Sequence, residues 1–367
     1  LAIDLPRVTS GLRYIHYTLL STKMFPSRST QNMRVVIMTL IALVTLSTAA
    51  PARVQQVDAP HPVFVGTNIP WNHFGFDIGG GAFEPEWFAN YFDSAKANGS
   101  NIARFWLHAD GRAGLVFDKT TGEVTGLTPT FLPELVQLVE IAENRSMVIQ
   151  ICLWSFDMCK EEAGPNRANL ISNHNSTNTY LTNALRPILG ALTQHNNILF
   201  EVINEPEWCM KETPCNTKAC VTTFEMQQFV ASTAVVIHEG GFKVTVGSAS
   251  LKWSAPNKPA IAFWFNDTAL MAANPGSSCA APTLDLYQIH YYDWMYNPTW
   301  GYDPMRANVS EWGLTDKLVV VGELPATSAH YSPTVMLKHS TENGFRGTLF
   351  WAYNDPSLPD AAAGPPM

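Results

Sequence analysis

An apolar run that ends in a carboxylate constrains the fold more than any other stretch of this sequence. The segment Ile198–Asn204 is apolar at five of its first six positions, as expected of a strand buried on both faces. Pro206 ends the run because proline has no N–H to donate to a neighbouring strand. Glu205 is therefore predicted at the carboxyl end of a buried strand. The run Leu318–Pro325 has the same form and places Glu323 at the end of a second strand.

Short apolar runs of this kind alternate with helical periodicity along most of the chain. Strands are predicted at 63–69, 101–107, 147–154, 198–204, 243–247, 284–290, 318–322 and 347–353. Helices are predicted at 84–98, 131–144, 179–194 and 222–239. Because no GxGxxG motif follows a strand, the alternation favours an α/β fold of the (β/α)8 TIM barrel type over an open doubly wound sheet. In such a barrel the active site lies where the carboxyl ends of the strands meet.

Composition and charge limit the classes of partner. The 367 residues are 46% hydrophobic and 15% charged, which suits one large barrel domain. The formal charge is −8, but residues 1–52 hold five basic residues and one acidic residue. The remaining 18 basic and 30 acidic residues give −12. This charge argues against nucleic acid or an anionic membrane as partner and is compatible with a neutral substrate. We expect a monomer that needs no cofactor and no metal.

The amino-terminal segment has the pattern of a secretory signal. Met33 and Arg34 precede the apolar run Val35–Leu46, and the small-residue stretch Ser47–Ala52 follows it. The run is shorter than the roughly 20 residues of a membrane span, so a cleaved signal is favoured over a retained anchor. We therefore expect an upstream or leader segment at 1–32, a signal peptide at 33–52, and a secreted, extracellular barrel at 53–367.

The carboxyl terminus fits a barrel less well. Only fourteen residues follow Tyr353, and they end in the sequence AAAGPPM. They cannot form a normal closing helix. We therefore expect an atypical or truncated end that leaves part of the outside of the first and last strands exposed.

Six cysteines in a secreted chain favour disulfides over a metal site. They allow 15 pairings, of which the local pairs Cys152–Cys159 and Cys215–Cys220 are expected, leaving Cys209–Cys279. The sequence has no CxxC pair and no HExxH motif, so a zinc site is disfavoured. Five Asn-x-Ser/Thr sequons could carry glycans, at Asn98, Asn144, Asn175, Asn266 and Asn308.

Two carboxylates at strand ends suggest hydrolysis of a glycosidic bond. The retaining reaction needs two carboxyl groups about 5–5.5 Å apart, one as nucleophile and one as acid and then base. Glu205 and Glu323 could supply them across the barrel mouth. Arg104, near the end of the second strand, could keep Glu323 ionised because an opposite charge lowers the pKa of a carboxylate. A negative Glu323 would in turn help to keep Glu205 protonated.

Polar and aromatic side chains at neighbouring strand ends could support this pair. Asn204 is suited to bind a sugar 2-hydroxyl, Tyr292 to donate a hydrogen bond to the nucleophile, and Trp351 to stack on a sugar ring. The other candidate substrate-binding residues are His290, Trp71, Trp253 and Trp294. Structural alternatives exist: Arg104 could be a buried ion-pair partner, His290 a hydrogen-bonded core residue, and any tryptophan part of the core.

Several motifs together resemble glycoside hydrolase family 5, whose acid/base lies in an Asn-Glu-Pro sequence and whose nucleophile ends a later strand. More closely, segments 71–77, 246–253, 285–294 and 320–325 resemble the secreted endo-β-1,4-mannanases of molluscs and other invertebrates. The similarity extends over about 63–356. It implies that Glu205 is the acid/base and Glu323 the nucleophile. The sequence departs from many members at Leu153-Trp154-Ser155, where they have a histidine.

The resemblance implies a secreted endo-β-1,4-mannanase that acts on β-mannan polysaccharides and manno-oligosaccharides. The substrates would be mannan, glucomannan or galactomannan. Two alternatives remain at this point. One is an endo-β-1,4-glucanase that uses the same carboxylates, and the other is a carbohydrate-binding barrel without catalytic activity.

Overall fold

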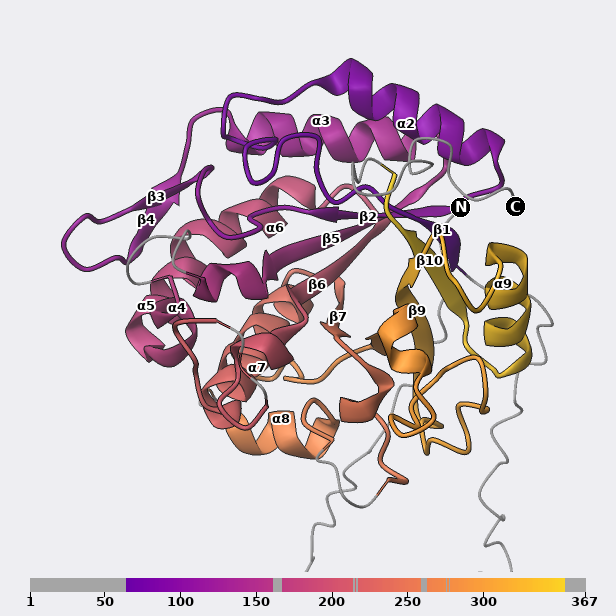
Figure 1. Cartoon of the computed structure of the whole chain (residues 1–367). Coiled ribbons are helices and arrows are strands. Elements are labelled where there is room, and N and C mark those ends of the chain that lie inside the picture. Colours follow the sequence, from indigo (N-terminus) through magenta and orange to yellow (C-terminus); the bar gives the residue numbers. More distant parts are fainter. Residues whose placement is uncertain are drawn as a thin grey trace, which may run out of the picture. The chain divides into compact units, whose positions relative to one another are not determined.

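Eight parallel strands close into a barrel, as predicted (Figure 1). The computed structural model describes residues 64–160, 167–213, 215, 217–258, 263–274, 276 and 278–353. Around the barrel the strand order is β1-β10-β9-β8-β7-β6-β5-β2. The strands are β1 (Phe64–Asn68), β2 (Ile102–Trp106), β5 (Val148–Ser155), β6 (Ile198–Asn204), β7 (Lys243–Ser248), β8 (Leu286–His290), β9 (Leu318–Pro325) and β10 (Gly347–Trp351).

Helices cover the outside of the barrel in the part of the chain that the structure describes (Figure 1). They are α2 (Pro85–Ala97), α3 (Phe131–Glu143), α4 (Asn169–Ser172), α5 (His174–Tyr180), α6 (Arg186–Leu192), α7 (Thr223–Glu239), α8 (Asp267–Ala273) and α9 (Pro333–Glu342). The helix predicted at 179–194 is interrupted, because a π-helical turn, Leu181–Leu185, joins α5 to α6. Helix α7 begins where predicted, since Thr222 and Glu225 form a reciprocal capping box at its amino end.

A short hairpin and several 3₁₀ helices lie at the carboxyl-terminal face of the barrel. Strands β3 (Leu115–Phe117) and β4 (Val124–Leu127) form an antiparallel hairpin that the sequence did not predict. Short 3₁₀ helices follow four of the barrel strands: η1 (Phe156–Cys159), η4 (Pro206–Cys209), η5 (Leu251–Trp253) and η6 (Asp293–Tyr296). These turns shape the rim above the strand ends and so determine which side chains surround the barrel mouth.

The inside of the barrel is filled in two layers. Apolar side chains close the amino-terminal end, and they are Phe64, Ile102, Leu199, Leu286, Val320 and Leu349. Polar side chains from four strands lie above them, and all are at most 1% exposed: Arg104, Gln150, Glu201 and Gln288. Glycine makes room for this layer, since a Cβ atom on Gly247 would lie 2.3 Å from Glu201 Oε1. The polar layer is the base on which the strand-end residues rest.

One of the three expected disulfides is present, and the other two expectations are wrong. Cys215 and Cys220 are bonded. Cys152 has a free thiol inside the barrel, where it donates to the Trp154 carbonyl oxygen, so it cannot reach the outer turn that carries Cys159. Cys209 is also free and buried, beside Cys159 rather than beside the exposed Cys279.

Several expectations lie outside the described residues. These are the leader at 1–32, the signal peptide at 33–52, residues 53–63 at the start of the expected domain, and the atypical end after Tyr353. Within the described residues, no helix combines the length and apolar character needed to cross a membrane.

Candidate active site

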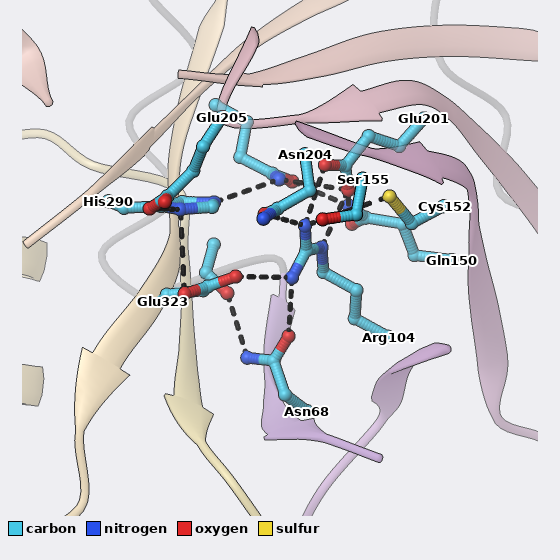
Figure 2. A network of polar contacts seen from close by, with 12 residues as sticks. Asn68, Arg104, Gln150, Cys152, Ser155, Glu201, Asn204, Glu205, His290 and Glu323 are labelled. Atoms are coloured by element: carbon cyan, nitrogen blue, oxygen red, sulfur yellow. Dashed lines mark hydrogen bonds and ion pairs between the residues drawn. The ribbon is translucent and has the colours of Figure 1, made fainter. Parts of the chain in front are cut away.

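Arg104 is the centre of a buried polar network at the carboxyl end of the barrel (Figure 2). Its guanidinium donates to Glu201 through Nε and Nη2, over 2.6 and 2.7 Å. It also donates to Glu323 Oε1 over 2.6 Å and to the side-chain oxygens of Asn204 and Asn68 over 2.7 and 2.8 Å. Arg104 is therefore a buried ion-pair partner that also contacts Glu323 and Asn204, two of the predicted site residues.

Four members of this network were not predicted from the sequence: Asn68, Gln150, Glu201 and Gln288. Glu201 is fully buried on β6 and accepts hydrogen bonds from Gln150 and Gln288 as well as from Arg104. Asn68, at the end of β1, donates to the Gly322 and Phe350 carbonyl oxygens. A usable signal existed for Glu201, since a charged residue inside an apolar strand run needs a buried partner.

Glu205 occupies a strained turn at the end of β6. Its backbone is left-handed, with φ 49° and ψ 53°, although it is not glycine and precedes a proline. Its N–H donates to the Gly247 carbonyl oxygen over 2.6 Å. The side chain accepts from Trp208 Nε1 over 2.8 Å and lies 2.8 Å from His290 Nδ1. The strained turn thus aims the carboxyl group into the mouth, where two nitrogens hold it.

Glu323 faces Glu205 from β9. It bonds Arg104 on one oxygen, and Tyr292 donates its hydroxyl to the other. Ligand atoms of Glu205, His290 and Glu323 all lie within 4.8 Å of one another. One oxygen of Glu205 and one oxygen of Glu323 therefore lie within 4.8 Å of each other, which is compatible with the separation of about 5–5.5 Å between the carboxyl groups of retaining enzymes. Among the described residues these three side chains are also the group that could hold a metal ion, but Arg104 already supplies a positive charge there.

Burial dominates the pKa values in the mouth. It raises the pKa of Glu205 to about 7, against the opposing hydrogen bond from Trp208. Burial also raises the pKa of Glu323, while His290, Arg104 and the Tyr292 hydroxyl act to lower it. The pKa of His290 falls to about 4 through burial, so its imidazole is neutral at pH 7. A neutral ring places no positive charge beside Glu205 and so does not oppose protonation of that carboxyl group.

A cavity of about 600 Å³ opens above the two carboxyl groups. Its walls contain Glu205, Glu323, Asn204, Tyr292, Trp71, Trp294 and Trp351 from the predicted set, together with Phe74, Trp106, Phe156, Asp157 and Trp208. Trp253 does not reach the wall, because it is 4% exposed and packs edge-on against Trp208 at 6.0 Å between ring centroids. Trp294, by contrast, is 51% exposed at the rim. The cavity therefore combines aromatic faces with a few polar groups, as sugar sites do.

Comparison with known proteins relates the chain to one group of enzymes. No protein-family model matches the sequence. The mannan endo-1,4-β-mannosidase of Cryptopygus antarcticus is 26% identical over 315 residues, covering 79% of this chain and 80% of the relative. The β-mannanase structure of the blue mussel Mytilus edulis superposes with a TM-score of 0.72 at 24% identity, covering 82% of this chain and 90% of the mussel chain.

Other solved structures share the fold. The endo-1,4-β-mannanase of Eisenia fetida gives a TM-score of 0.71 at 23% identity, with 82% of this chain and 89% of that chain covered. With the closed barrel, these matches confirm the resemblance to the invertebrate β-mannanases, and the prediction that this chain is a glycoside hydrolase is confirmed with it.

Proposed function

We propose that the protein is a secreted endo-β-1,4-mannanase that hydrolyses internal linkages of mannan, glucomannan or galactomannan with retention of configuration. The observation that carries the proposal is the close carboxylate pair at the ends of β6 and β9, in which each carboxyl group has a different environment. The names of the similar proteins support mannan as the substrate.

In the first step, Glu323 attacks the anomeric carbon while Glu205 protonates the leaving oxygen. The Tyr292 hydroxyl and Arg104 orient the nucleophile by binding both of its oxygens. Glu205 has a pKa of about 7 and can therefore carry the required proton up to near-neutral pH. Trp208 and His290 hold its carboxyl group in place.

In the second step, Glu205 acts as a base. It removes a proton from a water that attacks the covalent glycosyl-enzyme, and Glu323 is released. The side-chain oxygen of Asn204 already accepts a hydrogen bond from Arg104. The Asn204 amide NH2 is therefore the group that would donate to the sugar 2-hydroxyl. Two inversions return the β anomer.

The substrate assignment is tested by comparing the purified enzyme on mannan and on carboxymethyl cellulose, with reducing ends as the readout. Hydrolysis of mannan should be much faster. Equal rates would favour the endo-β-1,4-glucanase alternative, and no release from either polymer would favour a carbohydrate-binding barrel. NMR of early products should show the β anomer, and an α anomer would contradict retention.

The roles of the two carboxylates are tested by substitution. Glu323→Ala should be inactive on polymer and on aryl mannosides, because no covalent intermediate can form. Glu205→Ala should lose polymer hydrolysis but still react with a good aryl leaving group, and azide should restore its turnover because azide needs no base. Azide rescue of Glu323→Ala to the β-glycosyl azide, with Glu205→Ala inactive, would reverse the assignment.

A further inference from the structure

Asp157 is the carboxylate in the cavity wall that the proposed mechanism does not use. It lies on η1, directly after β5, and its side chain is 17% exposed. The β5 residue Ser155 is paired in register with Asn204 of β6, so the two strand ends are neighbours (Figure 2). The η1 turn also packs against η4, which follows Glu205. Asp157 therefore belongs to the acid/base side of the mouth.

The Asp157 carboxylate is held firmly but keeps free acceptor capacity. Ser155 donates its hydroxyl to Oδ2 over 2.5 Å, and Lys160 Nζ lies 2.5 Å from Oδ1. An ionised carboxylate offers about four lone-pair sites. These two contacts leave about half of them for a ligand, and they fix the direction in which the group points.

A second part of the mouth has a different chemistry. Trp71, Trp106 and Trp351 form a cluster with ring centroids 5.2–6.0 Å apart, in which Trp71 meets the other two rings edge-on and Trp106 and Trp351 are tilted. They lie at or just after the ends of β1, β2 and β10, the strands between β5 and β9. This aromatic wall runs from β10, beside the β9 strand that carries Glu323, to β2, beside the β5 strand that precedes Asp157. In the proposed reaction, the sugar that becomes attached to the nucleophile lies over Glu323, and the sugar that leaves lies beside Glu205, which protonates it.

We infer that Asp157 accepts a hydrogen bond from a hydroxyl of the leaving sugar and thereby selects neutral, hydroxyl-bearing leaving groups. Its negative charge would repel a leaving group that carries a carboxylate. Its closeness to the acid/base has electrostatic support: burial raises the pKa of Glu205 most, and the charge of Asp157 contributes in the same direction. The inference rests on the proposed function, because it assigns a role within the same reaction.

The test compares two substrates that differ in the leaving group. The leaving group of mannopentaose is a sugar with hydroxyls. The leaving group of 4-nitrophenyl β-mannobioside is a phenolate without sugar hydroxyls. The readout is kcat/KM for mannopentaose divided by kcat/KM for 4-nitrophenyl β-mannobioside. Asp157→Ala should lower this ratio about tenfold or more, which is the equivalent of one hydrogen bond to a charged group. Asp157→Asn keeps the shape and an acceptor oxygen, so its ratio should fall less. Asp118→Asn, an exposed carboxylate in the β3–β4 hairpin, is the matched control and should leave the ratio unchanged.

Each outcome decides a different claim. An unchanged ratio in Asp157→Ala, whether both rates fall equally or neither falls, would overturn the inference and leave the mannanase proposal intact. Activity of the unsubstituted enzyme on neither substrate would instead refute the proposed function itself. Soluble Asp157→Asn protein with an intermediate ratio would support the inference even if Asp157→Ala failed to fold.

Discussion

Removing Arg104 should destabilise the barrel in a strongly pH-dependent way. Arg104→Met deletes six hydrogen bonds, one of them to the Cys152 sulfur, and leaves Glu201 as a buried carboxylate without a cation. Breaking a buried pair by removing one partner costs about 3–5 kcal/mol. We expect a loss of that size in the free energy of unfolding at pH 7.

The sign of the pH dependence follows from Glu201. Burial acts to raise the pKa of Glu201, but Arg104 holds it below its ordinary value, so in the unsubstituted protein Glu201 contributes stability above about pH 4.5 that is lost as pH falls. Without Arg104, Glu201 can take up a proton and be neutral. The difference between Arg104→Met and the parent should therefore be large at pH 7 and shrink towards pH 4.

Urea unfolding followed by tryptophan fluorescence at pH 4, 5.5 and 7 would measure this difference. The double variant Arg104→Met/Glu201→Gln should regain part of the lost stability at pH 7, because it no longer buries a lone charge. Arg145→Met, which breaks an exposed pair with Asp93, is the control and should have a much smaller effect. A loss in Arg104→Met that is the same at every pH, with additive effects in the double variant, would refute this reasoning.

Three further predictions follow from the site and the sequence. The free energy of unfolding of Glu205→Gln should rise relative to that of the parent by up to about 3 kcal/mol between pH 4.5 and 8. The reason is that the parent loses stability as pH rises through the folded pKa of Glu205, which is about 7. A difference in urea unfolding that does not change with pH would contradict this. Trp294→Ala should raise KM for mannan more than for 4-nitrophenyl β-mannobioside, because the exposed ring lies at the rim; equal changes would argue against sugar contact. Amino-terminal sequencing of secreted protein should begin between Ala49 and Arg53, and a start before Met33 would exclude the predicted signal.

Buried strands with polar ends were the most predictable part of this protein. The run that ends in Glu205 and the run that ends in Glu323 predicted two buried strands and the two carboxyl groups at their ends, because strand burial and proline placement are local properties. The structural alternative for Arg104, a buried ion-pair partner, is confirmed, and its role in the site stays a prediction.

Features that depend on long-range geometry were not predictable. Cys152 and Cys159 are seven positions apart, but one points into the barrel and the other lies on the rim turn. Asp157 gave no signal in the sequence, because its role depends on which strand end lies beside it. The largest cause of the raised Glu205 pKa is burial, rather than the charge of Glu323 that sequence reasoning invoked.

The left-handed backbone at Glu205 has a consequence for directed evolution. A side chain in this conformation costs roughly 1–3 kcal/mol, which glycine would avoid. Glu205→Gly should therefore fold more stably than Glu205→Ala, although both lack the carboxyl group proposed as the acid/base. A library selected for thermostability alone would therefore enrich Glu205→Gly at the expense of hydrolytic activity. A screen for more stable variants must measure sugar release in the same round.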